Sequence, residues 1–315
     1  MLRLHSTRLF PKDRGATQYR LTGIAKRCDW IVLSDKTDPQ THLIKRPGSR
    51  TPNTVFLSFR WQRAALEFFV DQVLPQIKAP FTLVSGSEDT TIPNQTDARM
   101  TAFNAQDREA VAAILDHPML KAWVAENLDD ADHAKLHPLP LGMVYNDPPQ
   151  IRELVAIPSS PPLSERPLKA LCGHRIRPGE QWATRRKVSG FAEDSWRDWC
   201  TQIDQDVSED AFIRQIEDHA FVICVEGGGI DPSPKAWLAL LHGAVPIIKR
   251  SALDKAYEHL PVAFVDDWTA DALSIERLRA WQQELSPLFD QAGLRRSVQK
   301  RLSLDYWWDY VLTRA

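Results

Sequence analysis

The residues best suited to chemistry lie in one short segment that joins three glycines to polar side chains. This segment is Val225-Glu226-Gly227-Gly228-Gly229-Ile230-Asp231, followed by Pro232-Ser233-Pro234-Lys235. Glycines let the main chain approach a bulky anion, and the amides at the start of a following helix favour phosphate. Ser233 can cap that helix, and Lys235 adds a positive charge in its first turn. The segment predicts an anion or nucleotide site, and a glycine turn needed only for close packing is the alternative.

The elements around this segment alternate between strands and helices. In the second half of the chain we expect strands at 168–172, 220–225, 245–248 and 262–265, helices at 208–218, 234–242 and 271–281, and a long amphipathic C-terminal segment at 293–312. Residues 220–225 are almost all apolar, as in strands buried on both faces of a parallel sheet. Ligands of such sheets bind outside the carboxyl ends of the strands, which is where the three glycines follow.

The first half of the chain shows the same alternation, with strands expected at 30–34, 55–61, 81–84, 121–125 and 139–143 and helices at 62–77 and 107–116. Residues 1–29 lack clear periodicity, and residues 36–53 are rich in proline and charge, so we expect irregular structure in both. Alternating strands and helices indicate parallel βαβ units. We therefore predict two α/β domains at 1–150 and 168–315, joined by a proline-rich linker at 151–167.

The composition excludes several classes of function. The chain has 39 basic and 41 acidic side chains and a net charge of -2, which gives no general drive towards nucleic acid. Its four cysteines show no CxxC spacing, and Cys172 and Cys224 are expected to be reduced core residues. The first residues lack the apolar core of a signal peptide, and no apolar run approaches the roughly 20 residues of a membrane span. We therefore expect a cytoplasmic protein without a nucleic-acid partner.

The run from 220 to 268 resembles the donor-binding half of the exostosin-like glycosyltransferases and related GT-B enzymes. The matching residues begin with the glycine segment and continue through Lys235-Ala236-Trp237, Leu240, Gly243-Ala244-Val245-Pro246-Ile247-Ile248, Ser251, Leu260-Pro261-Val262 and Val265-Asp266-Asp267-Trp268. The first half also looks like this family, in Trp123-Val124-Ala125-Glu126-Asn127, His133, Lys135-Leu136 and Leu139-Pro140-Leu141-Gly142-Met143. The two sets occur in the family's order, one in each predicted domain.

The resemblance implies a GT-B fold, in which two Rossmann-like domains face a cleft and a C-terminal helix crosses back to the first domain. It implies a glycosyltransferase that moves a hexosyl or pentosyl unit from a nucleotide-sugar donor to a glycan, polysaccharide or lipid-linked acceptor. The nucleotide sugar is a substrate, so no cofactor is expected. An obligatory metal is not expected either, because Asp266-Asp267 is more typical of a strand end than of a manganese site in this family. A lipid-linked acceptor is compatible with peripheral association with a membrane.

The resemblance assigns donor binding mainly to the second domain. A fixed cation stabilises the charge that develops on a departing nucleoside diphosphate, and we expect it from the basic segment 174–187, with Arg175 and Arg185 preferred. A solvated basic loop is the alternative. The family's acidic residue after the helix tryptophan is Leu238 here, so Glu226 or Asp231 is expected to hold the donor ribose. The full donor-binding set is His174, Arg175, Arg185, Glu226, Gly227, Gly228, Gly229, Asp231, Ser233 and Lys235.

The candidate catalytic residues are carboxylates of the first domain. An inverting transferase needs a carboxylate or a histidine there to deprotonate the acceptor hydroxyl. Glu88, Asp89 and Glu126 stand at the ends of expected strands and are the candidates, with Asp35 as a further strand-end carboxylate. A retaining enzyme can act without such a base, so loop or capping roles stay open for all of them. Asn127 is expected to orient the acceptor or the edge of the domain.

Two other functions stay open. A catalytically silent GT-B-like protein that binds a nucleotide or a glycan would account for Leu238, whereas the retained glycines and Lys235 favour an active transferase. The third interpretation is a nucleotide-sugar epimerase or a phosphorylase, and the absence of a lysine motif for a pyridoxal cofactor weakens the phosphorylase version. Nucleoside diphosphate binding followed by a turnover assay distinguishes the transferase from the silent binding protein.

Overall fold

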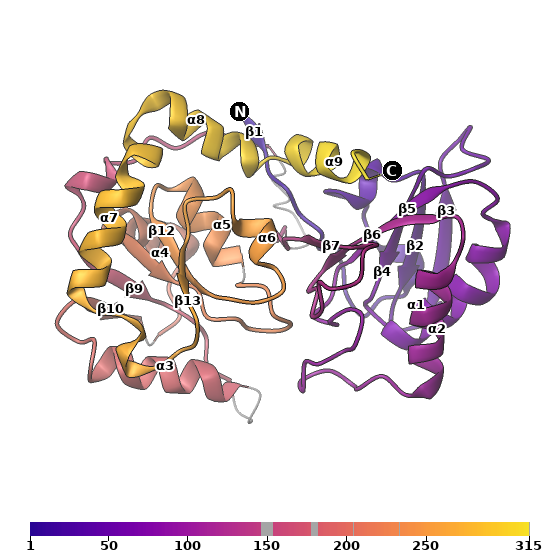
Figure 1. The fold of residues 1–315 in the computed structure, drawn as a ribbon, viewed down its shortest axis with the longest axis horizontal. Coiled ribbons are helices and arrows are strands. Elements are labelled where there is room, and N and C mark those ends of the chain that lie inside the picture. Colours follow the sequence, from indigo (N-terminus) through magenta and orange to yellow (C-terminus); the bar gives the residue numbers. More distant parts are fainter. Residues whose placement is uncertain (146–153, 178–181, 204, 233, 315) are drawn as a thin grey trace. The chain divides into compact units, whose positions relative to one another are not determined.

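The computed structural model describes residues 1–145, 154–177, 182–203, 205–232 and 234–314, and Figure 1 follows them along the chain. The chain forms two compact units. The first unit contains Arg3–Val155, Gly228–Asp231 and Ser303–Ala315, and the second contains Met1–Leu2, Ala156–Gly227 and Pro232–Leu302. The glycine segment is therefore divided, because Gly227 belongs to the second unit and Gly228–Asp231 belongs to the first.

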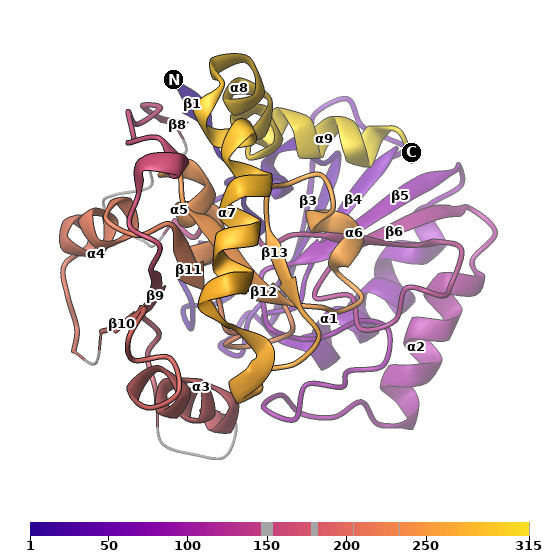
Figure 2. The same ribbon diagram turned by 60° about the vertical axis from the view of Figure 1, so that its left-hand side comes forward.

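The first unit is built on a six-stranded sheet with the order β3-β2-β4-β5-β6-β7, and Figure 2 labels β3, β4, β5 and β6 among its strands. Its strands are β2 (Trp30–Ser34), β3 (Thr41–Lys45), β4 (Thr54–Ser58), β5 (Phe81–Gly86), β6 (Leu120–Glu126) and β7 (Leu136–Leu139). Neighbouring strands are parallel, except that β3 pairs antiparallel with β2 at one edge. Two further strands, β1 (Leu2–Arg3) and β8 (Leu154–Val155), are two residues long.

Burial explains why these residues form strands and helices. Every residue of β2 and β4 is buried, as expected for parallel strands that are covered on both faces. Helix α1 (Gln62–Phe68) packs against β2, β3 and β4, and helix α2 (Ala105–Asp116) packs against β6. The helix predicted at 62–77 is present, but it changes pitch into a π-helical segment (Phe69–Val73) and a 3-10 turn (Leu74–Gln76).

The second unit is built on a five-stranded, wholly parallel sheet with the order β10-β9-β11-β12-β13. Its strands are β9 (Ala170–Cys172), β10 (Cys200–Gln202), β11 (Phe221–Ile223), β12 (Val245–Lys249) and β13 (Ala263–Val265). Its helices are α3 (Ala183–Glu193), α4 (Glu209–Glu217), α5 (Pro234–Leu241), α6 (Asp254–Tyr257), α7 (Ile275–Asp290) and α8 (Ala292–Arg301). Ser208 caps α4 by accepting the amide of Ala211 at 3.3 Å, which confirms the predicted cap.

The C-terminal segment predicted at 293–312 is two helices, not one. After α8 ends, Ser303 starts a new helix, α9 (Leu304–Leu312), by accepting the amide of Tyr306 at 3.2 Å. Helix α9 belongs to the first unit and packs against β5, and Thr82 donates to the carbonyl of Arg314 at 3.0 Å. The α/β class, the two mainly parallel sheets and the return of the C-terminal helix to the first unit are therefore confirmed.

Two local predictions are wrong. Residues 41–45, expected to be a loop, form the edge strand β3, because one edge of a sheet tolerates the charged and polar side chains found there. The strand expected at 139–143 lies earlier, at β7. Part of the predicted linker falls outside the described residues, and its end holds a short 3-10 turn (Leu163–Glu165). The basic segment 174–187 is not a loop throughout, because α3 begins within it at Ala183.

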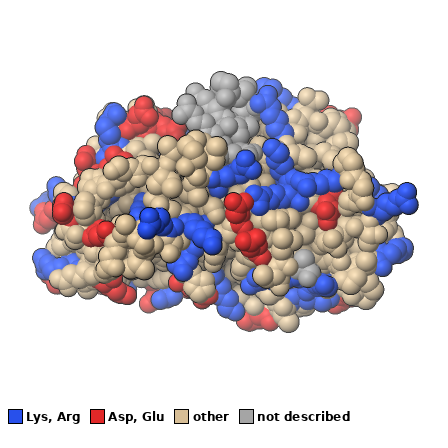
Figure 3. All heavy atoms as spheres, turned by 90° about the horizontal axis from the view of Figure 1, so that it is seen from above, with Lys and Arg blue, Asp and Glu red and all other residues tan. Residues whose placement is uncertain are grey.

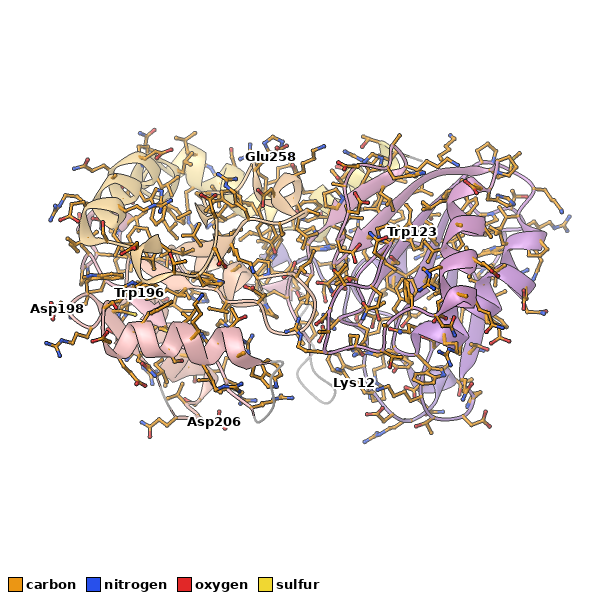
Figure 4. The ribbon with its side chains drawn as sticks, turned by 60° about the horizontal axis from the view of Figure 1, so that its bottom comes forward. Lys12, Trp123, Trp196, Asp198, Asp206 and Glu258 are labelled. Carbon is orange, nitrogen blue, oxygen red and sulfur yellow. The ribbon has the colours of Figure 1, made fainter. Side chains whose placement is uncertain are left out.

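Apolar side chains fill the core of each unit, and most charged side chains lie on the surface. Trp123 and Trp196 are buried within their units, whereas Asp198 and Asp206 lie at the margin in Figure 4. Both basic and acidic side chains occur across the face shown in Figure 3. All four cysteines are buried, as predicted for Cys172 and Cys224, and no disulfide joins them within the described ranges. Within the described ranges no helix has the length and apolar character needed to cross a membrane.

Candidate functional site

The three carboxylates predicted as candidate bases come together in the first unit. Strand β5 ends at Gly86 and is soon followed by Glu88 and Asp89, and Glu126 is the last residue of β6. These strands are parallel neighbours, so their carboxyl ends lie at the same edge of the sheet. This is the edge at which α/β proteins bind ligands.

A buried arginine joins the three carboxylates. Arg8 Nη2 donates to Asp89 Oδ1 at 2.6 Å and forms an ion pair with Glu126 Oε1 at 2.7 Å, and Arg8 Nη1 lies 3.8 Å from Glu88 Oε1. Burial alone would lower the pKa of Arg8, but the negative charges of these carboxylates outweigh burial and raise that pKa beyond its ordinary value. Arg8 is therefore a permanent cation at the centre of the cluster.

Glu126 is the most deeply buried of the three, with a side chain that is 0% exposed. Its Oε2 accepts from the Thr7 hydroxyl and from the Ser87 amide. Its Oε1 accepts from Asn127 Nδ2 and forms an ion pair with Arg8. Burial raises the pKa of Glu126 to about 7, although Arg8 and the hydrogen bonds oppose the rise. Glu126 can hold a proton at neutral pH, but protein groups surround its carboxylate.

Asp89 is the most accessible of the three, with 31% of its side chain exposed. Burial opposes ionisation, yet the Arg8 guanidinium holds the pKa of Asp89 below its ordinary value. Its Oδ1 accepts from Arg8, whereas Oδ2 has no hydrogen-bond partner in the described part of the chain. A Cβ atom on Gly228 would overlap Oδ2, so the carboxylate lies against bare main chain.

Glu88 is held by a second arginine. Arg60 is 4% exposed, and its Nη1 donates to Glu88 Oε2 at 2.7 Å while its Nη2 donates to the carbonyl of Leu9 at 2.8 Å. Glu88 Oε1 accepts the amide of Asp89 at 3.2 Å. Glu88 therefore orients the loop after β5, and it is less accessible than Asp89.

The amides of Gly229, Ile230 and Asp231 are occupied by side chains of the first unit. Asp97 Oδ2 accepts the Gly229 amide at 2.7 Å, and Asn127 Oδ1 accepts the amides of Ile230 at 2.9 Å and Asp231 at 3.0 Å. The Asp231 carboxylate accepts the amide of Leu141 at 3.0 Å. The phosphate cradle predicted from the sequence is thus filled at these three amides, because carboxylate and amide oxygens can replace phosphate oxygens.

An arginine lies against the remaining glycine in the second unit. Arg185 is 8% exposed and donates to the carbonyls of Glu226 at 3.2 Å, Arg175 at 3.0 Å and Val225 at 3.3 Å. A Cβ atom on Gly227 would clash with the guanidinium of Arg185. Helix α3, which carries Arg185, thus brings a cation to the carboxyl end of β11.

Lys235 stands in the first turn of α5, at the same end of the second sheet. Burial, together with the positive charge of Arg185, lowers the pKa of Lys235 to about 8. The positive charges of Lys235 and Arg185 repel each other, and a bound anion would reduce this repulsion. The amino end of α5 adds the positive end of a helix dipole.

The other predicted donor-binding residues have clear local roles. His174 Nε2 lies 2.9 Å from the carbonyl of Arg185 and 3.1 Å from Ser189 Oγ, so it supports the start of α3. Arg175 is 70% exposed and pairs with Asp206 at 3.0 Å. Glu226 accepts from Lys249 at 2.8 Å and from Trp268 Nε1 at 3.0 Å, and Ser233 lies outside the described residues.

Several residues of these clusters were missed by sequence reasoning. Arg8 lies in a stretch without periodicity, and Asp97 and Arg99 lie in a long loop without a motif. Arg99 pairs with Asp97 and donates to the carbonyl of Gly229 at 2.5 Å. The Arg185 guanidinium lies 5.0 Å from the centre of the Trp182 ring, a cation–π contact that the spacing of three residues could have suggested.

The two clusters offer fixed cations and carboxylates as their chemical groups. Among the residues that the structure describes, no group of three or more His, Cys, Asp or Glu side chains could hold a metal ion.

Comparison with known proteins gives a similarity of fold. No protein-family model matches the sequence, and no curated protein matches it. Sucrose-phosphate synthase (tll1590) from Thermosynechococcus elongatus is 12% identical over 83% of this chain and 72% of that chain, with a TM-score of 0.47. Spinosyn rhamnosyltransferase SpnG complexed with thymidine diphosphate is 12% identical over 83% of this chain and 72% of that chain, with a TM-score of 0.37. An alpha1,3-fucosyltransferase is 11% identical over 86% of this chain and 78% of that chain, with a TM-score of 0.38. Each is a similarity of fold at low sequence identity.

Proposed function

We propose that this protein is a glycosyltransferase that uses a nucleotide-sugar donor. The observation that carries the proposal is the pair of cations in the second unit. Arg185 lies against Gly227, and burial together with the charge of Arg185 lowers the pKa of Lys235 to about 8. A nucleoside diphosphate supplies the negative charge that relieves this repulsion. The resemblance of the glycine segment to exostosin-like transferases supports the same ligand class, with Glu226 as the candidate for the ribose hydroxyls.

The proposed acceptor site is the carboxylate cluster of the first unit, with Asp89 as the general base. Asp89 is preferred because its Oδ2 has no partner in the described ranges and its side chain is 31% exposed. Glu126 is fully enclosed and Glu88 is held by Arg60, so neither offers an open oxygen as readily. The acceptor is proposed to be a glycan, a polysaccharide or a lipid-linked sugar.

The proposed reaction is a direct displacement. The acceptor oxygen forms a bond to the anomeric carbon of the donor sugar, and the acceptor proton moves to Asp89 Oδ2. The bond between the anomeric carbon and the diphosphate oxygen breaks, and the nucleoside diphosphate leaves with the electron pair. Arg185 and Lys235 stabilise the negative charge of that leaving group, a role that a divalent cation fills in other transferases. We propose that transfer needs no metal, so EDTA should leave the rate unchanged.

The test begins with binding and proceeds to turnover. Thermal shift and calorimetry with UDP, GDP, CDP, ADP and dTDP should identify one preferred nucleotide, and release of that nucleotide from its sugar conjugates should then be measured. Lys235→Ala should weaken binding about tenfold or more, since a charge-assisted bond contributes about 1.5–3 kcal/mol. Arg197→Ala is the matched control, because Arg197 is 73% exposed and pairs only loosely with Asp198 at 3.8 Å. Absence of binding by every nucleotide would refute the proposal.

A silent binding protein is the second candidate, and one observation favours it. The amides of Gly229, Ile230 and Asp231 are already occupied by Asp97 and Asn127. A protein that binds a nucleotide but never turns it over would show a thermal shift without release of sugar from any donor. That result, obtained with a broad set of acceptors, would favour the silent protein over the transferase.

A further inference from the structure

Arg8 lies at the centre of the carboxylate cluster, among several other charged side chains. Arg8 and Arg60 are two buried cations that contact Glu88, Asp89 and Glu126. Lys12 and Arg99 also act on Asp89, and Asp231 acts on Glu126. Burial, with a contribution from the negative charge of Asp231, favours a proton on the enclosed Glu126. The positive charge of Arg8 favours the ionised form of Asp89.

The geometry around Arg8 distinguishes the two oxygens of Asp89. Arg8 holds Oδ1 at 2.6 Å, and the same nitrogen holds Glu126 Oε1 at 2.7 Å. Oδ2 is left without a partner in the described ranges and faces the bare main chain of Gly228. One guanidinium nitrogen thus ties the exposed carboxylate to the most rigidly enclosed one, and this arrangement sets the direction in which Oδ2 points.

We propose that Arg8 is a positioning residue of the transfer reaction, which holds Asp89 by Oδ1 so that Oδ2 receives the proton of the acceptor hydroxyl. This inference rests on the proposed function, in which Asp89 is the base. Arg8 acts through Asp89 and needs no contact with the reacting atoms. Its position is in turn fixed by Glu126, whose own partners Thr7 and Ser87 hold it in place.

Arg8 also retains a donor that the cluster does not use. Its Nε–H group is buried and has no hydrogen-bond partner within the described ranges, and the same is true of Nε–H in Arg60. Buried donors without a partner are rare in proteins and costly to keep.

The charge of Arg8 has a second consequence for Asp89. Its positive charge favours the ionised form, so its removal should raise the pKa of Asp89. The other charged groups that act on Asp89 or share its cluster are Lys12, Arg60, Arg99, Glu88 and Glu126. Lys12 and Arg99 remain in a protein with Arg8 replaced, so they limit the rise in the pKa of Asp89 without cancelling it.

The experiment compares Arg8→Met and Arg8→Lys with the wild-type protein, and Arg27→Met is the matched control. Arg27 pairs with the exposed Asp305 in the same unit, and no ion pair joins it to Glu88, Asp89 or Glu126 in the described residues. Arg8→Met should lower kcat about 100-fold, within the range for loss of a positioned base, while the KM for the donor stays within about twofold. The acidic limb of the pH profile should move to higher pH, because the pKa of Asp89 rises when the charge of Arg8 is removed. Arg8→Lys keeps the positive charge, so the acidic limb of its pH profile should stay where it is in the wild-type protein. Its kcat should fall, because one ammonium group cannot hold both carboxylates.

Carboxyl carbon NMR of protein labelled at Asp and Glu provides a readout that needs no turnover. The signal of Asp89 is assigned with Asp89→Asn, and its pKa should rise in Arg8→Met and stay low in Arg8→Lys. If the wild-type protein transfers no sugar but Asp89 shows this pattern, the proposed function fails while the electrostatic control of Asp89 by Arg8 stands. If the protein transfers sugar and either Arg8 variant keeps the wild-type kcat, the positioning role is wrong. If Arg8→Met fails to fold, the kcat of Arg8→Lys decides whether Arg8 positions Asp89, because this variant keeps the charge and changes the geometry of the contact.

Discussion

Asp89 and Gly228 lie so close together that a single methyl group cannot be added between them. They are 139 positions apart in the chain, yet both belong to the first unit, and a Cβ atom on Gly228 would overlap Asp89 Oδ2. The φ angle of Gly228 is not positive, so its backbone conformation does not require glycine. The lack of a side chain is needed only to leave room for the Asp89 carboxylate. The proposed base therefore has its position set on one side by Arg8 and on the other by a glycine main chain.

We predict that Gly228→Ala uncouples nucleotide binding from transfer. The methyl group should displace the Asp89 carboxylate, and kcat should fall by about 100-fold, the typical contribution of a general base. Nucleoside diphosphate affinity should stay within about twofold, because Arg185 and Lys235 belong to the second unit. Steady-state kinetics and calorimetry on the same preparation measure both quantities.

Gly293→Ala is the control for this substitution. Gly293 lies in α8, and no described atom outside its own helix segment lies within 4 Å of a Cβ atom placed there. Alanine should leave kcat unchanged and raise helix stability by up to about 1 kcal/mol. Equal loss of kcat in both variants would show that the effect of Gly228→Ala is not local to Asp89.

Arg185 should contribute more to diphosphate binding than Arg175. Arg185 is 8% exposed and lies against Gly227, whereas Arg175 is 70% exposed and pairs with Asp206. We expect Arg185→Lys to weaken nucleoside diphosphate binding by about tenfold, since lysine cannot reproduce the planar fork of arginine. Arg175→Ala should change affinity by about twofold or less, as for most exposed charges. Calorimetry would contradict this ranking if Arg175→Ala had the larger effect.

The fold could be predicted because local patterns determine it. The apolar runs at 30–34 and 220–225 identify strands that the two sheets bury, and the bounds of β2 agree residue for residue. Ser208 and Pro234 mark the starts of α4 and α5 as expected. The edge strand β3 was missed because its half-exposed residues lack an apolar run, and an edge strand needs fewer buried residues.

The site could be predicted only in part, because its contacts join distant positions. The carboxylates were found from their places after strands, but Arg8 contacts Glu126 over a separation of 118 residues, which no local pattern reveals. The occupation of the Gly229 amide by Asp97 is equally non-local. A glycine-rich segment indicates that something acidic or polar approaches the main chain, and it does not distinguish a ligand from the protein's own side chains.

Nucleotide affinity should decrease at alkaline pH because of Lys235. Its pKa of about 8 means that the lysine of the unbound protein is charged below pH 8 and loses its charge above it. A bound diphosphate favours the charged form, so affinity should fall by about tenfold between pH 7 and pH 9. Lys235→Arg should remove this dependence, because arginine stays charged over the whole range. Calorimetric titrations at several pH values test this, and an equal decline in both proteins would exclude Lys235 as the cause.

The stability of the first unit should fall as the pH rises towards neutrality because of Glu126. Its pKa is raised from 4.5 to about 7, so the folded state holds the proton more tightly than the unfolded state. The resulting stabilisation is fully present below about pH 4.5 and is lost as the pH passes through 7; it amounts to about 3 kcal/mol at most. Glu126→Gln cannot titrate, so its free energy of unfolding minus that of the wild-type protein should increase over this interval. Urea unfolding at pH values from 4.5 to 7.5 measures the difference. A constant difference would mean that Glu126 is ionised in the folded protein over this range.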